Sequence, residues 1–269
     1  MLRLACVALL VWGIGVGALA CSLGSRGDAT LRVLAAASLT EAFTELGAVF
    51  QREHPGVKVE FSFGGSQTLR TQLEQGLQAD VFASADPRQM ELAVAAGLVA
   101  GPPASFASNR LVVIVPSASP PGAVRVQRLS DLAQPGVKVV LALPEVPAGG
   151  YARTALAKMA SAGGDFGPDY ATRVLANVVS QETSVRQVAQ KVALGEADAG
   201  IVYQTDARSP DVAGRVEVID IPEVMNVTAI YPIAALRGSA QPQLAQGFAR
   251  LVLSPQGRGT LAQHGFGPP

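Results

Sequence analysis

Apolar runs of strand length alternate with amphipathic segments of helix length along most of this 269-residue chain. Residues 31–35 are typical of a buried strand, and residues 39–54 carry apolar side chains at helical spacing until Pro55 ends the pattern. The same order continues with strands at 57–63 and 80–84 and helices at 66–76 and 87–96. This alternation predicts an α/β fold, because parallel strands are joined by crossover helices.

A second set of alternating segments follows the first. We expect strands at 111–115, 137–143, 199–203, 216–221 and 229–236, and helices at 151–162, 184–194, 243–253 and 255–263. Two such units predict two lobes, each a mostly parallel sheet flanked by helices. Because open α/β sheets bind ligands at the carboxyl ends of their strands, two facing lobes would enclose a ligand cleft.

The N-terminal segment differs from the rest of the chain. Arg3 precedes an uncharged apolar run that ends at Cys21, and this pattern is typical of an export signal. We therefore expect residues 1–21 to be a signal peptide and residues 22–30 to be a flexible tether. Export predicts a periplasmic or otherwise extracytoplasmic protein.

Cys21 itself has two interpretations. The small residues before it resemble a bacterial lipobox, which predicts lipidation of Cys21 and a membrane anchor. The residues Ala18-Leu19-Ala20 also fit ordinary signal-peptidase cleavage.

Composition argues against several classes of function. The chain has 21 basic and 21 acidic residues, so its charge balance does not favour a nucleic-acid partner. No glycine-rich loop ends in Gly-Lys-Ser or Gly-Lys-Thr, and no His or Cys cluster has metal-ligand spacing. We therefore expect no cofactor and no metal held by direct coordination.

The chain also lacks the signature of a serine hydrolase. Its two histidines, His54 and His264, lie far apart in the sequence, and no Gly-x-Ser-x-Gly motif is present. We expect no enzymatic activity, and a secreted α/β hydrolase is kept as an alternative from a different class.

Two serines occupy matching turns, each between a predicted strand and the helix that follows it. Ser38 precedes Glu41 in the pattern of a capping box, and Ser66 follows Gly64 and Gly65. The simplest interpretation of Ser38 is a helix cap. The alternative is oxyanion binding, because helix N-termini present free N–H groups and a partial positive charge. Two such turns at successive strand ends would share one spot above the carboxyl edge of the sheet.

Three later positions fit the same interpretation. The turn at 146–152 carries no side chain suited to a ligand, so any contact from it must come from main-chain N–H groups. Residues 182–186 lie at the start of the next helix. The strand 199–203 ends in Tyr203, whose side chain is either a packing group or a hydrogen-bond donor.

Together, these segments resemble the molybdate-binding periplasmic protein family of ABC importers. The resemblance spans residues 31–266 and rests on the order and spacing of the stretches 35–40, 66–69, 79–86, 147–152, 200–203 and 231–233.

This resemblance implies a two-lobed periplasmic-binding-protein fold of type II. Lobe 1 would contain residues 31–108 plus 226–269, and lobe 2 would contain residues 109–225, with crossovers near Ser108 and Met225. It also implies a monomer that works with the membrane permease subunits of an ABC importer.

The resemblance further implies a binding site made of uncharged donors from both lobes. Ser38 and Ser66 would supply hydroxyl and main-chain N–H groups from the first lobe. Ala148 and Val185 would supply main-chain N–H groups from the second lobe, and Tyr203 its phenol O–H. The metal would enter only as the oxyanion.

A site that contains only donors favours a fully deprotonated anion. Phosphate near neutral pH carries a proton and needs an acceptor, whereas molybdate, tungstate and sulfate do not. A cavity of fixed backbone groups then selects by size, because a smaller ion leaves some buried donors unpaired. We expect molybdate or tungstate as the ligand, with sulfate or another small oxyanion as the alternative.

Overall fold

The computed structural model describes residues 29–118 and 122–269. The predicted signal peptide, including Cys21, lies outside the described residues, as does most of the predicted tether. The prediction that the tether extends to residue 30 is wrong. Ala29 and Thr30 already belong to the first strand, because they pair with Val57 and Lys58 of the next one.

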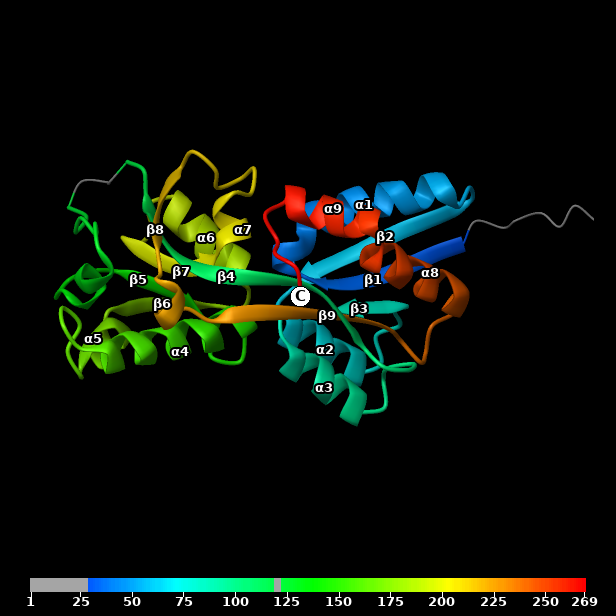
Figure 1. Cartoon of the computed structure of the whole chain (residues 1–269), viewed down its shortest axis with the longest axis horizontal. Helices are drawn as coiled ribbons and strands as arrows, with labels where there is room; N and C mark the ends of the chain where they lie inside the picture. Colours follow the sequence, from blue (N-terminus) through cyan, green and yellow to red (C-terminus); the bar gives the residue numbers. More distant parts are fainter. Residues whose placement is uncertain (1–28, 119–121) are drawn as a thin grey trace, which may run out of the picture.

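The first group of elements, here called the first lobe, is built on three parallel strands. β1 (Ala29–Ala36) lies between β2 (Val57–Gly64) and β3 (Val81–Ala83). Helices cover both faces of this sheet (Figure 1). They are α1 (Thr40–Glu53), α8 (Pro242–Leu253) and α9 (Pro255–Gln263) on one face, and α2 (Ser66–Glu74) and α3 (Pro87–Ala95) on the other.

The second group, here called the second lobe, repeats this plan. β5 (Val139–Ala142) lies between β6 (Val178–Glu182) and β7 (Ala199–Tyr203), and all three strands are parallel. The helices and the remaining strand of this lobe are α4 (Pro147–Ala162), α5 (Tyr170–Ala176), α6 (Val185–Ala193), α7 (Gln204–Ala207) and β8 (Val216–Asp220).

Two long strands pass between the lobes (Figure 1). β4 (Ala104–Pro116) pairs antiparallel with β9 (Thr228–Ala235) along its first half and with β7 and β8 along its second half. The described strands therefore form one continuous path in the order β2-β1-β3-β9-β4-β7-β5-β6, with β8 beside β4. The fold is thus α/β with two lobes, and the joining strands are antiparallel.

Short 3₁₀ turns complete the described elements, at Ala37–Leu39, Leu129–Ala133 and Glu223–Met225. Several predicted boundaries differ from the structure. β4 begins at Ala104 and not at residue 111, because pairing with β9 holds its polar first half in strand conformation. α5 and β6 were not predicted, since their sequences carry no clear periodicity.

α4 begins at Pro147 and not at Tyr151. Proline is tolerated in the first turn of a helix, and the small residues after it allow that turn to pack tightly on β5. A Cβ atom at Gly149 would lie only 2.0 Å from the carbonyl oxygen of Leu143. The glycine therefore brings the start of α4 against the end of β5.

An aromatic cluster holds α8 against α1 in the first lobe. The ring of Phe248 meets Phe43 at a centroid distance of 5.7 Å and Phe50 at 5.6 Å, both edge-on. All three side chains are buried. Among the described residues, no helix is both long enough and apolar enough to cross a bilayer.

Phe248→Ala should lower the free energy of unfolding by about 3–5 kcal/mol, because it leaves a cavity between α8 and α1. Urea unfolding measures the change. Val224→Ala is a suitable control, since Val224 is 82% exposed and its loss should change stability by less than about 0.5 kcal/mol. Equal stability of the two variants would contradict this account of the core.

Candidate functional site

The residues predicted to bind the anion line one small cavity between the lobes. Ser38, Ser66, Ala148, Val185 and Tyr203 all contribute to its wall. The cavity has a volume of about 10 Å³. That volume is close to the minimum that holds one water molecule, so the lobes leave almost no empty space between them in this structure.

The topology explains why these residues meet. β1 and β2 are parallel neighbours, so the turns after them, with Ser38 and Ser66, lie at the same edge of the sheet. β5, β6 and β7 are also parallel, and the chain after them leads to Ala148, to Val185 and to Tyr203 as the last strand residue. The two carboxyl edges face each other across the cavity.

Three helix N-termini point their first N–H groups at this region. Ser66 is the first residue of α2, Ala148 lies in the first turn of α4, and Val185 is the first residue of α6. The N–H groups of these three residues find no acceptor among the described residues. They are donors with a favourable helix dipole behind them, an arrangement that suits an anion.

The simplest interpretation of Ser38, a helix cap, is wrong. Ser38 lies in the 3₁₀ turn before α1, the helix begins at Thr40, and its N-terminus has no side-chain cap. Glu41, the expected partner in a capping box, instead pairs with Arg186 of the second lobe. The Ser38 hydroxyl lies 3.0 Å from the hydroxyl of Tyr231.

The hydroxyl of Ser66 accepts a hydrogen bond from the main-chain N–H of Ala85 at 3.0 Å. Because a serine hydroxyl has a single hydrogen, accepting this bond leaves that hydrogen available for another acceptor. Ser66 is 1% exposed and lines the cavity, so this hydrogen can be directed into the cavity.

Tyr203 presents the clearest unmet donor. Its side chain is 1% exposed, and its hydroxyl has no hydrogen-bond partner among the described residues. Burial raises the pKa of Tyr203 well above its ordinary value, so the phenol keeps its proton. A buried hydroxyl without an acceptor is costly, which favours an acceptor supplied by a ligand.

The described residues that line the cavity include no Asp, Glu, Lys, Arg or His. Arg186 follows the lining residue Val185 in the chain. Its Nε lies 2.9 Å from Asp206 Oδ1, and its guanidinium also pairs with Glu41. Burial raises the pKa of Asp206 to about 6, against the opposing effect of the Arg186 charge. Both close contacts of the Arg186 guanidinium are therefore with carboxylates.

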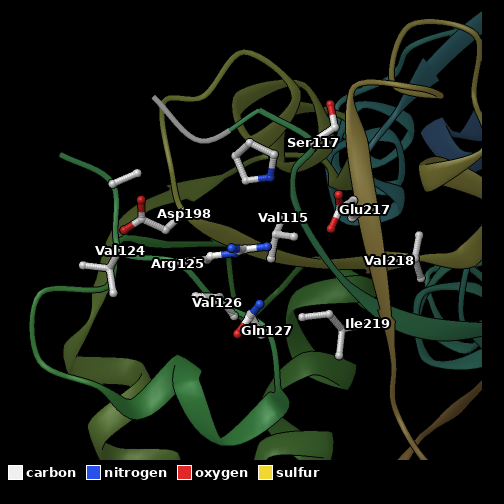
Figure 2. A pocket seen from close by; sticks show the side chains of 12 residues that line it. Val115, Ser117, Val124, Arg125, Val126, Gln127, Asp198, Glu217, Val218 and Ile219 are labelled. Atoms are coloured by element: carbon white, nitrogen blue, oxygen red, sulfur yellow. The ribbon is translucent and has the colours of Figure 1, made fainter. Parts of the chain in front are cut away.

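A larger cavity lies elsewhere in the second lobe (Figure 2). It has a volume of about 550 Å³ and is lined by Arg125, Asp198 and Glu217 among others. None of the predicted site residues contributes to it. In the part of the chain that the structure describes, no group of three or more His, Cys, Asp or Glu residues is placed to hold a metal ion.

Comparison with known proteins places the chain in a family. Residues 31–267 match the family described as bacterial extracellular solute-binding protein. The chain belongs to this family. Over 245 residues it is 42% identical to the molybdate-binding protein ModA of Mycobacterium tuberculosis, a match that covers 91% of this chain and 87% of the relative.

Solved structures share the fold of this solute-binding protein. The periplasmic molybdate-binding protein of Azotobacter vinelandii superposes with a TM-score of 0.74 at 21% identity, covering 89% of this chain and 99% of that one. The sulfate-binding protein SubI of Mycobacterium tuberculosis gives 0.76 at 21% identity, covering 89% and 87%. The two-lobed α/β architecture is therefore that of the periplasmic binding proteins.

The lobes of this solute-binding protein also touch beside the cavity. Gln67 of the first lobe donates from Nε2 to the carbonyl oxygen of Thr183 at 3.1 Å, and Glu41 pairs with Arg186. Sequence reasoning missed these contacts, because their partners are 116 and 145 residues apart in the chain.

Gly65 allows a close approach between the lobes. A Cβ atom at this position would lie 2.3 Å from the carbonyl oxygen of Thr183. The backbone of Gly65 has φ −63° and ψ 132°, which any residue adopts without strain. An added methyl group would also lie 2.6 Å from Nε2 of Gln67 in the first lobe, but that flexible side chain can move aside. Its main effect would therefore be to oppose the contact with the second lobe.

Gly65→Ala should weaken binding of molybdate, the ligand expected from the sequence, by about 10- to 100-fold, because overpacking at the lobe contact costs about 1–3 kcal/mol. Isothermal titration calorimetry measures this loss. Urea unfolding without ligand should remain unchanged. Gly259→Ala is the matched control, since a Cβ atom there meets nothing within 4 Å. Wild-type affinity in Gly65→Ala would contradict the role given to this contact.

Proposed function

We propose that this protein binds molybdate outside the cytoplasm and delivers it to the membrane permease of an ABC importer. Its membership of the solute-binding family and its 42% identity to ModA of Mycobacterium tuberculosis support this proposal. The observation that carries it is the set of buried, uncharged donors, above all the Tyr203 hydroxyl, which has no acceptor among the described residues. Such donors fit an anion that brings only acceptors.

The cavity chemistry favours a fully deprotonated dianion over hydrogen phosphate. A P–OH group would need an acceptor, and no carboxylate lies among the described residues that line the cavity. Ser38, Ser66 and Tyr203 would donate hydroxyl hydrogens, and Ala148 and Val185 their main-chain N–H groups. Several such charge-assisted hydrogen bonds can replace the water shell of the ion without a lysine or arginine.

The proposal includes tungstate as a second ligand, because its anion is nearly equal in size to molybdate. Sulfate is the competing candidate ligand. It is included in the test because the fold is similar to that of a sulfate-binding protein. Sulfate is smaller and would leave at least one buried donor unpaired, which costs about 1–3 kcal/mol.

The proposal also covers the arrangement of the mature chain. Lobe 1 would comprise residues 29–108 plus 226–269 and lobe 2 residues 109–225, rotating about β4 and the chain that enters β9. We propose a monomer that is anchored to the membrane by a lipid on Cys21. Mass spectrometry of the protein purified from membranes tests the anchor, since an unmodified thiol at Cys21 or cleavage that removes it would rule the lipid out.

Calorimetry with molybdate, tungstate, sulfate and hydrogen phosphate tests the function. Molybdate and tungstate should bind tightly, sulfate about 10- to 100-fold more weakly, and phosphate more weakly still. Ser38→Ala and Tyr203→Phe should each weaken molybdate binding by about 10- to 100-fold, because each removes one charge-assisted donor.

Tyr170→Phe is the control for Tyr203→Phe. Tyr170 is also fully buried, but its hydroxyl bonds to the carbonyl of Leu129 and it does not line the cavity. Tight sulfate binding without a response to molybdate would contradict the assignment of molybdate as the ligand. Wild-type molybdate affinity in both Ser38→Ala and Tyr203→Phe would place the site elsewhere.

A further inference from the structure

Behind Ser38, a buried chain of hydrogen bonds leads away from the cavity. The Ser38 hydroxyl lies 3.0 Å from the hydroxyl of Tyr231, which in turn lies 3.4 Å from Asn109 Nδ2. The same nitrogen donates to Thr205 Oγ1 at 2.9 Å. All four side chains are buried, and only Ser38 among them lines the cavity.

The direction of these hydrogen bonds follows from Asn109. Its Oδ1 accepts from the main-chain N–H of Arg110 at 2.9 Å. Because a main-chain N–H can only donate, the side-chain atom that faces it is the oxygen. The other atom is then the nitrogen, which can only donate. The oxygen atoms of Tyr231 and Thr205 therefore both accept from Asn109.

Tyr231 then determines which hydroxyl donates in its hydrogen bond with Ser38. Burial raises the pKa of Tyr231, so its phenol keeps its hydrogen. Its oxygen accepts from Asn109, and the phenol hydrogen is left to point at its other neighbour, the Ser38 oxygen. Since Ser38 accepts this bond, its own hydrogen is free for an acceptor in the cavity.

We propose that Tyr231 and Asn109 are positioning residues that hold the Ser38 hydroxyl as a donor toward the bound anion. This inference rests on the proposed function and adds two residues to it. Neither residue touches the ligand. Their effect is to fix which way the Ser38 hydrogen points before the anion arrives, so that less orientational freedom is lost on binding.

The positions of the two residues fit this role. Asn109 lies on β4 and Tyr231 on β9, the strands that join the lobes, and Thr205 belongs to the second lobe. Asn109 pairs with Ala229 in the ladder between these strands, and Tyr231 pairs with Ala107. The hydrogen bonds that lead from Asn109 through Tyr231 to Ser38 are here called the relay. The relay therefore starts on two paired strands and not on a flexible loop.

A double-mutant cycle tests the proposal by calorimetry with molybdate. Tyr231→Phe should weaken molybdate binding by about 3- to 10-fold, the effect of losing one neutral hydrogen bond. In a Ser38→Ala background the same change should alter affinity by less than about 2-fold, because the relay then has no hydroxyl to orient. An effect of equal size in both backgrounds would show a purely structural role and overturn the proposal.

Two further variants sharpen the result. Tyr170→Phe removes another buried tyrosine hydroxyl that does not line the cavity, and it should leave molybdate affinity unchanged. Asn109→Ala removes the donor at the start of the relay and should repeat the pattern of Tyr231→Phe, including its loss in the Ser38→Ala background. Thermal unfolding without anion confirms that each variant is folded, and Asn109→Ala serves as the test if Tyr231→Phe does not fold.

The outcomes separate this inference from the proposed function. If the wild-type protein binds molybdate and Tyr231→Phe binds it equally well, the relay is wrong and the function stands. If the wild-type protein does not bind molybdate, the proposed function itself fails.

Discussion

The hydroxyl of Tyr203 and the N–H groups of Ala148 and Val185 meet at a buried cavity where no described residue accepts a hydrogen bond from them. Each buried donor without an acceptor costs about 1–3 kcal/mol, so contact between the lobes is unfavourable until something supplies acceptors. A dianion with four oxygen atoms meets this need. The ligand thus contributes the free energy that holds the lobes together, and a protein without ligand is expected to favour separated lobes.

The rest of the fold positions these donors. Parallel strands place the turns after β1 and β2 at one edge and those after β5, β6 and β7 at another. The antiparallel strands β4 and β9 join the two lobes and allow these edges to face each other. Gly65 permits the close approach of the lobes, and Arg186 of the second lobe pairs with Glu41 of the first and with Asp206.

Sequence patterns predicted much of this because the relevant signals are local. Strand, turn and serine follow one another within a few residues around Ser38 and Ser66, and the strand that ends in Tyr203 has the predicted bounds. The contacts that define the arrangement are not local. Ser38 meets Tyr231 across 193 residues, and a glycine such as Gly65 shows its role only once Thr183 is placed beside it. The helix cap predicted at Ser38 is wrong for the same reason, because Glu41 pairs with Arg186 of the other lobe.

The most direct test of the account is a crystal structure with molybdate, in which anomalous scattering at the molybdenum edge locates the metal. The account predicts one molybdenum atom in the cavity between the lobes. Its oxygen atoms should lie about 2.7–3.1 Å from the hydroxyls of Ser38, Ser66 and Tyr203 and from the main-chain nitrogens of Ala148 and Val185. Molybdenum bound elsewhere, or held by a lysine, an arginine or a carboxylate, would contradict it.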